Sequence, residues 1–239
     1  MQLDALLRSI GRYAPQYGKV KIIYKCTSDL HRRAYEILRQ EAVGHLWIEE
    51  GDDFKQNVLD AMNSVMRMVT FLVDDDLFYR LLPEFDVSPN VAYAPRLGRN
   101  CTRCYNANDR SQEVPTHLWR QVGGEGNLDF DCTLSLDGHV YLLSDVLSYF
   151  REMEYANPSQ IEEFMSSRIR PHLTFAEHSC LVGIPHNVVA DWKGNRSMDG
   201  SAEELCRMYL EGQRIDLDAM DFSNVNSVHQ DIPYAFRRA

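Results

Sequence analysis

The chain has 239 residues, which is long enough for one large α/β domain. Its composition, with 44% hydrophobic and 25% charged residues, is that of a globular protein and argues against disorder. Lys and Arg total 25 and Asp and Glu total 35, and the formal charge of -10 disfavours a nucleic acid partner, whose phosphates need a positive surface. No apolar run approaches the ~20 residues that span a bilayer, and no signal peptide pattern opens the chain, so we expect no transmembrane segment and a cytoplasmic location.

The first part of the chain alternates helical and strand patterns. Leu3, Leu6, Leu7 and Ile10 recur at helical spacing, which predicts a helix over residues 2–13. Strands are predicted over residues 20–24, 46–48 and 68–73, the last covered on both faces, with helices beginning near Asp29 and Phe54. This alternation indicates an α/β fold with a Rossmann-like, mostly parallel central sheet flanked by helices. Because no strand precedes the first helix, we expect that a strand is missing there.

The second part of the chain has a mixed pattern. Residues 90–97 predict an edge strand interrupted by Pro95, and Gly123–Gly126 predicts a flexible segment beside strands. Pro158 is placed to open one helix, and the Ser201–Glu204 capping box opens another that Gly212 ends. We therefore expect a single domain, with a nucleotide-sugar-binding half over residues 1–100 and a mixed acceptor-side half over residues 101–239.

Three consecutive carboxylates, Asp74, Asp75 and Asp76, directly follow the predicted strand over residues 68–73. Ligands of parallel sheets bind beyond the carboxyl ends of the strands, where these residues fall. Ionising three adjacent carboxylates is costly unless a divalent cation or several donors offset the repulsion. Oxygen ligands suit Mg²⁺ or Mn²⁺, so the triplet predicts a metal-bound diphosphate. The alternative is a solvated turn that caps a short helix over residues 77–82.

The stretch Phe71–Leu77, after the helix and strand alternation, resembles the Asp-x-Asp signature of GT-A fold glycosyltransferases, which transfer sugar from a nucleotide-diphosphate donor. The stretch Met1–Ile10 is similar to the first helix of such enzymes, and the resemblance covers most of residues 1–150. It implies a UDP- or GDP-linked sugar donor, a saccharide or a lipid- or protein-linked acceptor, and Mn²⁺ or Mg²⁺ as cofactor.

The resemblance also implies roles for particular residues. Asp74 and Asp75 would approach the donor ribose and sugar, and Asp76 would coordinate the metal. A late histidine is often a further metal ligand in this family, and His229 occupies such a position; the alternative is a surface or packed histidine. Lys25 would face the nucleotide, or else is an ordinary solvated lysine.

Transfer with inversion needs a base for the acceptor hydroxyl, whereas transfer with retention does not. The segment Leu134–Tyr141 resembles the position where inverting GT-A enzymes keep their catalytic acidic residue, which makes Asp137 the candidate base. Asp137 and Gly138 also fit an ordinary hairpin turn. We expect Ser144 to cap the next helix, and Asp145 is the reserve candidate, although acidic residues in a first helical turn usually complement the dipole.

Other functions remain open from sequence. A nucleotidyl or phosphoryl transferase would use the same carboxylates, but the chain has no G-x-x-x-x-G-K-[ST] phosphate loop. A glycosidase is disfavoured because adjacent carboxylates cannot flank a bond from opposite sides. A degenerate transferase-like binding module is the alternative outside the enzymes. Cys101 and Cys104 form a C-x-x-C pair that favours free thiols over zinc, since no second pair accompanies it.

Overall fold

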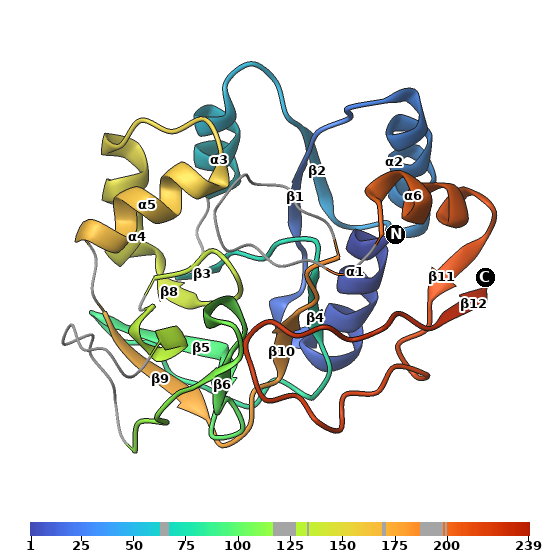
Figure 1. Cartoon of the computed structure of the whole chain (residues 1–239). Coiled ribbons are helices and arrows are strands. Elements are labelled where there is room, and N and C mark those ends of the chain that lie inside the picture. Colours follow the sequence, from blue (N-terminus) through green and yellow to red (C-terminus); the bar gives the residue numbers. More distant parts are fainter. Residues whose placement is uncertain (63–66, 117–127, 133, 169–170, 187–197, 199) are drawn as a thin grey trace.

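The structure is a computed structural model that describes residues 1–62, 67–116, 128–132, 134–168, 171–186, 198 and 200–239. Its helices, within these residues, are α1 Gln2–Tyr13, α2 Asp29–Glu41, α3 Phe54–Met62, α4 Leu143–Glu152, α5 Pro158–Arg168 and α6 Ala202–Leu210. Short 3-10 turns cover Pro15–Tyr17, Tyr105–Ala107 and Leu128–Asp131. The fold is therefore mixed α/β (Figure 1).

The strands are β1 Lys21–Tyr24, β2 Leu46–Glu49, β3 Met68–Thr70, β4 Asp76–Phe78, β5 Val91–Gly98, β6 Arg103–Cys104, β7 Arg110–Ser111, β8 Val140–Leu142, β9 His172–Ala176, β10 Leu181–Gly183, β11 Gln213–Ile215 and β12 Phe236–Arg238. They form a four-stranded sheet in the order β3-β8-β5-β9 and the pairs β1-β2, β4-β10, β6-β7 and β11-β12. Short segments thus build several small sheets.

The strand directions correct the predicted sheet. Within the described residues, β1 with β2 and β5 with β9 are parallel pairs, whereas β3 with β8, β5 with β8 and β4 with β10 are antiparallel. The helical and strand periodicity marked the elements but carried no information about which strands pair. The prediction of a Rossmann-like, mostly parallel central sheet was wrong, and the mixed α/β class is what holds.

The predicted helices and strands of the first part are confirmed in type. The helix predicted over residues 2–13 is α1, and its apolar residues Leu6, Leu7 and Ile10 are buried. Strand β1, helix α2 and strand β2 then form a β-α-β unit, whose two strands appear at the top centre of Figure 1. Helix α2 begins where Ser28 Oγ accepts a hydrogen bond from the His31 backbone N–H, a typical N-cap.

Several local predictions were wrong. Strand β3 is not covered on both faces, because Met68 is exposed. Residues 77–82 do not form a helix: Asp76 begins strand β4, so the triplet is not a helix cap. Ser144 does not cap α4, which follows Leu142 without a side-chain cap.

Strand β5 is internal, not an edge strand, because it pairs with β8 on one side and β9 on the other. The sheet tolerates Pro95 because the pairing register with β9 shifts between Tyr93 and Gly98. The carbonyl oxygen of Pro95 still accepts a hydrogen bond from the Cys180 backbone N–H at 2.8 Å. Pro95 therefore interrupts the pairing only locally, and the strand continues through Arg96 to Gly98.

The later helix ends are confirmed. Pro158 opens α5, and Asn157 Oδ1 accepts from the Gln160 backbone N–H at 3.0 Å. Ser201 Oγ accepts from the Glu204 backbone N–H at the start of α6, and Gly212 follows with a φ of 82°. The predicted flexible segment Gly123–Gly126 lies outside the described residues. The division into two halves of one domain stays a prediction.

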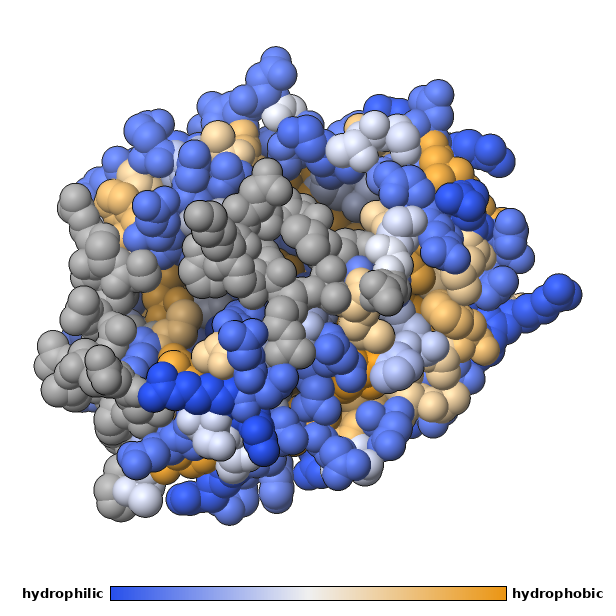
Figure 2. All heavy atoms as spheres, in the orientation of Figure 1, coloured by the Kyte–Doolittle hydropathy of each residue, from blue (hydrophilic) through white to orange (hydrophobic). Residues whose placement is uncertain are grey.

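The hydrophobic core surrounds the four-stranded sheet. Its largest cluster joins α3, α4 and α5 to β5 and β9 through buried side chains that include Phe150, Met165 and Leu173. These helices lie together above the sheet in Figure 1, while α2 and α6 pack against each other at the upper right of the same view. Hydrophilic residues make up much of the coloured surface in Figure 2, with hydrophobic residues exposed between them. No helix in the described part of the chain is long and apolar enough to cross a membrane.

Candidate functional site

Three segments that are far apart in sequence meet next to the acidic triplet. Asp76 opens β4 and faces Gly183 of β10, and Gly183 in turn forms a parallel bridge with His229. The Gly183 backbone N–H donates to the Val228 carbonyl at 2.9 Å, and the Gln230 N–H donates to the Gly183 carbonyl at 3.0 Å. Gly183 therefore pairs with both Asp76 and His229, which places these two residues on either side of strand β10.

Gly183 gives the imidazole ring of His229 its space. A Cβ built on Gly183 would lie 2.4 Å from Cδ2 of His229, a distance that real Cβ atoms essentially never show. Glycine is needed here for close approach, not for an unusual backbone conformation. The lack of a side chain at Gly183 therefore allows His229 to lie over strand β10.

Asp137 joins the same cluster through the register of β5 and β8. Tyr93 of β5 faces Val140 of β8 in an antiparallel pair; Arg96 follows Tyr93 by three residues and Asp137 precedes Val140 by three, which brings Arg96 to the turn that carries Asp137. Arg96 Nη1 donates to Oδ2 of Asp137 at 2.7 Å, and His229 Nε2 lies 3.4 Å from the same oxygen. The side chain of Arg96 is only 6% exposed, so this ion pair is largely shielded from water.

The turn that carries Asp137 is held from two sides. The Gly138 N–H donates to the Phe71 carbonyl at 2.7 Å, which ties the turn to the segment just before the triplet. On the other side, Oε1 of Glu162 accepts from the Leu136 N–H at 2.9 Å. Gly138 has a φ of 90°, as expected for a glycine in a tight turn. These contacts fix the backbone on both sides of the Asp137 side chain.

The carboxylates of the cluster respond differently to burial. Asp76 is 1% exposed, and burial together with the charges of Asp137 and Asp75 raises its pKa well above the ordinary value. Burial, then Asp74 and Asp137, raise the pKa of Asp75 to about 7. Asp74 keeps an exposed side chain, yet desolvation by the surrounding protein raises its pKa. A positive charge beside the triplet would lower these pKa values and favour the ionised carboxylates.

Asp137 shows the opposite shift. Burial alone would raise its pKa, but Arg96 and then His229 outweigh burial and hold the pKa below the ordinary value. Asp137 is consequently ionised at neutral pH. In the described part of the chain, both of its ion-pair contacts use Oδ2, so Oδ1 has no assigned hydrogen-bond partner.

The donor set fits a hard divalent cation in its chemistry. Asp75 and Asp76 offer carboxylate oxygens, and His229 offers an imidazole whose buried Nδ1 has no hydrogen-bond partner among the described residues. The described residues contain no group of three or more His, Cys, Asp or Glu side chains arranged to hold a metal ion. Mg²⁺ is typically bound by one or two carboxylates together with substrate phosphates, so the protein need not supply a complete cage.

Two of the predicted residues lie apart from the cluster. The ammonium group of Lys25 forms an exposed ion pair with Glu50 at 2.7 Å. Asp145, the reserve base, accepts from the Asn90 N–H at 2.8 Å, beside the amino end of β5, whereas Arg96 lies near its carboxyl end. The structure thus brings together Asp75, Asp76, Asp137 and His229, with Asp74 exposed at the adjoining position.

Sequence reasoning did not select Arg96, Glu162 or Gly183. An arginine inside an otherwise apolar strand is a signal for Arg96, because a buried charge needs a partner. Glu162 and Gly183 have no comparable signal, since a glutamate on a helix and a glycine in a short strand are both common. Their contribution depends on pairing between segments that the sequence pattern did not reveal.

The cysteines behave as free thiols. Cys101 and Cys104 are buried and unpaired, and Cys104 Sγ donates to Oδ1 of Asp129 at 3.2 Å. Desolvation raises the pKa of Cys101 to about 11, which favours the protonated form. The C-x-x-C pair therefore contributes packed thiols to the core.

Comparison with known proteins adds no family to these observations. A scan against protein-family models found no match, and neither did a search of curated protein sequences.

Proposed function

We propose that the chain is a GT-A-like glycosyltransferase that uses a nucleotide-diphosphate sugar and Mn²⁺ or Mg²⁺. The single observation that supports this most is the convergence of Asp75 and Asp76, Asp137 and His229, which come from three distant segments. The roles of all three segments were inferred from the same family resemblance, which did not specify that this chain would bring them together. An arbitrary solvated acidic turn gives no reason to expect a second carboxylate and a histidine beside it.

On the donor side, Asp76 and His229 would hold the metal, and Asp74 and Asp75 would approach the ribose and the sugar. The metal, when bound, supplies positive charge that stabilises the departing diphosphate. The raised pKa values of Asp75 and Asp76 support this role, since carboxylates crowded without enough positive charge favour a cation. The acidic net charge makes a local cation the more important for binding an anionic donor.

On the acceptor side, Asp137 would accept the proton of the attacking hydroxyl. Arg96 keeps this carboxylate ionised, which is the form that accepts a proton, and Oδ1 is the oxygen that the ion-pair contacts leave for it. The same pairing makes Asp137 a weaker base than a carboxylate whose pKa lies near the operating pH. Glu162 lies on the other side of the turn and is the second carboxylate to compare with it.

Calorimetry with UDP and GDP, each with Mn²⁺ or with a chelator, tests the donor site. We expect binding that requires Mn²⁺ and weakens at least about tenfold in Asp76→Asn, since a neutral amide is a poorer ligand for a hard cation. Asp218→Asn is the matched control because Asp218 is an exposed aspartate paired with Arg12. The Asp218→Asn variant should bind UDP or GDP with Mn²⁺ as tightly as the wild type does.

Three results would reject the donor site. Lack of binding to either diphosphate would favour a degenerate binding module. Binding that persists with the chelator and in Asp76→Asn would remove the triplet from metal binding. Clear preference for ATP or GTP, titrated under the same conditions, over the diphosphates would favour a nucleotidyl or phosphoryl transferase.

A further inference from the structure

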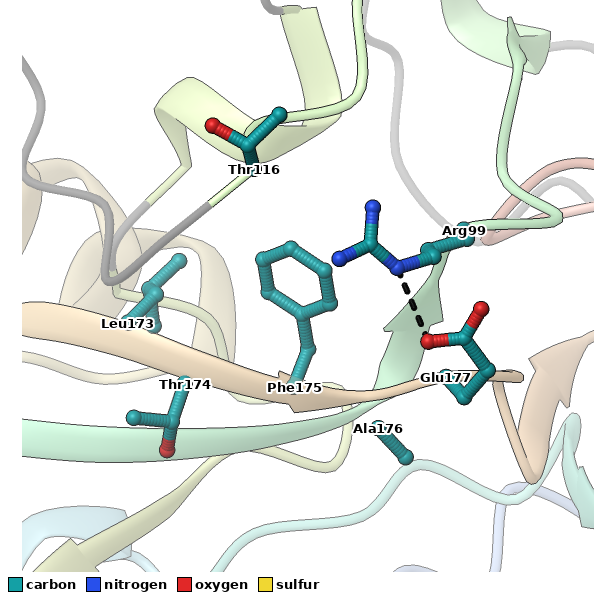
Figure 3. A pocket seen from close by; sticks show the side chains of 7 residues that line it. All are labelled: Arg99, Thr116, Leu173, Thr174, Phe175, Ala176 and Glu177. Atoms are coloured by element: carbon teal, nitrogen blue, oxygen red, sulfur yellow. Dashed lines mark hydrogen bonds and ion pairs between the residues drawn. The ribbon is translucent and has the colours of Figure 1, made fainter.

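A second feature lies at the carboxyl ends of the parallel strands β5 and β9. A half-open cavity of about 210 Å³ is lined by residues that include Arg99, Thr116, Phe175 and Glu177 (Figure 3). Gly98 pairs with Ala176 at the end of this ladder, so Arg99 and Glu177 follow directly after the two strands. Ligands of parallel strands bind beyond their carboxyl ends, which makes this cavity a reasonable binding position.

The floor of the cavity is apolar and aromatic. Leu173 and Phe175 project from β9 to the same side, as alternate residues of a strand do, and Thr116 faces them in Figure 3. Phe130 packs edge-to-face against Phe175, with ring centroids 5.2 Å apart. This contact fixes the orientation of the Phe175 ring, which remains half-buried at the cavity.

The rim of the cavity carries balanced charge. Arg99 Nε donates to Oε2 of Glu177 at 2.8 Å, and the Arg99 backbone N–H donates to the Glu177 carbonyl at 3.0 Å. Within the described contacts, Arg99 uses only Nε of its guanidinium, and Glu177 uses only Oε2 of its carboxylate. The pair therefore offers both donors and an acceptor to a ligand while its net charge is zero.

The size and chemistry of the cavity restrict the ligand. Pockets for drug-sized ligands typically measure about 300 Å³ or more, so a cavity of about 210 Å³ suits one small ring better than a nucleotide. An anion would find Arg99 already neutralised by Glu177, and a wholly apolar ligand would leave the charged rim unused. A neutral polyhydroxylated ring suits both the floor and the rim of the cavity. Its C–H face can pack on the Phe175 ring, and its hydroxyls can form hydrogen bonds with Arg99 and Glu177.

We propose that this cavity binds a neutral sugar ring of the acceptor, an inference that rests on the proposed function. Arg96, which pairs with Asp137, lies two residues before the end of β5, and Arg99, at the cavity, directly follows that strand, so at most roughly 10 Å of backbone separates the two residues. The saccharide ring held at Phe175 is then a neighbour of the ring whose hydroxyl lies at Asp137. The cavity selects the acceptor, and the carboxylate cluster acts on it.

Ligand-observed saturation-transfer NMR on the full chain, without nucleotide or metal, tests this site. The probes are the methyl glycosides of glucose, galactose, mannose and N-acetylglucosamine, with glucuronic acid as the anionic probe. We expect at least one neutral glycoside to bind, with an apparent Kd that rises at least fivefold in Arg99→Gln and in Phe175→Leu. Arg32→Gln should bind like the wild type, since Arg32 and Glu49 form a similarly exposed ion pair elsewhere.

Arg99→Gln changes an exposed residue, so it keeps the test valid if Phe175→Leu fails to fold. Lack of binding by every neutral probe, equal binding in the wild type and Arg99→Gln, or binding by glucuronic acid alone would each overturn the sugar site. Because the measurement contains no nucleotide or metal, its failure is separate from a failure of the donor titrations. Intact Mn²⁺-dependent UDP or GDP binding in Arg99→Gln would show that only the acceptor subsite is affected.

Discussion

Arg96 and Asp137 form a shielded ion pair in which Nη1 of the guanidinium lies 2.7 Å from Oδ2 of the carboxylate. The pair joins the end of β5 to the turn before β8, and His229 shares the same carboxylate oxygen. The pair thus connects the strand that leads to the cavity beside Phe175 with the segment that carries His229, the candidate metal ligand.

Arg96→Met should destabilise the fold by about 3 kcal/mol or more, because it leaves the Asp137 charge buried without its main partner. Urea unfolding at neutral pH measures this loss. Arg32→Met is the matched control, since Arg32 forms an exposed, screened pair with Glu49 and its loss should change the unfolding midpoint little.

The double variant Arg96→Met with Asp137→Asn removes both charges and should recover part of the stability lost in Arg96→Met. Equal midpoints for Arg96→Met and Arg32→Met would contradict the assignment of a shielded pair.

Gly183→Ala should destabilise the fold by about 1–3 kcal/mol, the usual cost of forcing extra volume into a packed site. The new Cβ would meet Cδ2 of His229 at 2.4 Å, so either the ring or strand β10 must move. Under the proposed function, the same change should weaken Mn²⁺-dependent UDP or GDP binding, because His229 is displaced.

Gly11→Ala is the control for Gly183→Ala. A Cβ on Gly11 meets nothing within 4 Å, and Gly11 lies inside helix α1, where alanine is favoured by about 0.5–1 kcal/mol. Denaturant unfolding should therefore separate the two variants in opposite directions. A Gly183→Ala protein with wild-type stability would show that His229 does not lie over this glycine.

The sequence named several residues of this candidate site, but only as separate segments. Hydrophobic periodicity predicted α1, α2 and β2, the repulsion among adjacent carboxylates pointed to Asp76, and the family resemblance pointed to Asp137. Strand pairing was predicted poorly, since short apolar strands such as β3 and β4 pair equally well in either direction. Arg96 meets Asp137 because of an antiparallel register, and no local pattern in residues 90–97 specifies that register. Which residues lie around the triplet could therefore be seen only in the folded structure.

Glu162→Gln should alter how stability depends on pH. Burial, and then the charge of Asp137, raise the pKa of Glu162 above its ordinary value of 4.5, so the folded state binds a proton more tightly than the unfolded state. The contribution of Glu162 is fully present below its unfolded pKa and is lost as pH rises through the folded pKa. Glutamine keeps an oxygen for the Leu136 N–H but does not titrate.

The free energy of unfolding should therefore fall more steeply with rising pH in the wild type than in Glu162→Gln, from about pH 4.5 upward. Urea unfolding across this range measures both slopes. Glu84→Gln, at an exposed position, should follow the wild type. Parallel curves for the wild type and Glu162→Gln would show that Glu162 has no raised pKa in the folded protein.

Asp137→Asn separates the proposed base from the donor site. Donor affinity with Mn²⁺ should stay near that of the wild type, whereas turnover should fall by about 10²–10⁴-fold, the usual contribution of a general base. Turnover is measured as release of UDP or GDP from the corresponding sugar nucleotide, at a temperature where the variant remains folded. That precaution is needed because asparagine leaves the shielded Arg96 charge without its partner carboxylate.

Glu162→Gln in the same assay decides between the two carboxylates around the turn. With Asp137 as base, Glu162→Gln retains most of the turnover, because the Leu136 N–H keeps its acceptor and the turn stays in place. Undiminished turnover in Asp137→Asn together with a large loss in Glu162→Gln would transfer the role to Glu162. Undiminished turnover in both variants would favour transfer with retention, which needs no base for the acceptor hydroxyl.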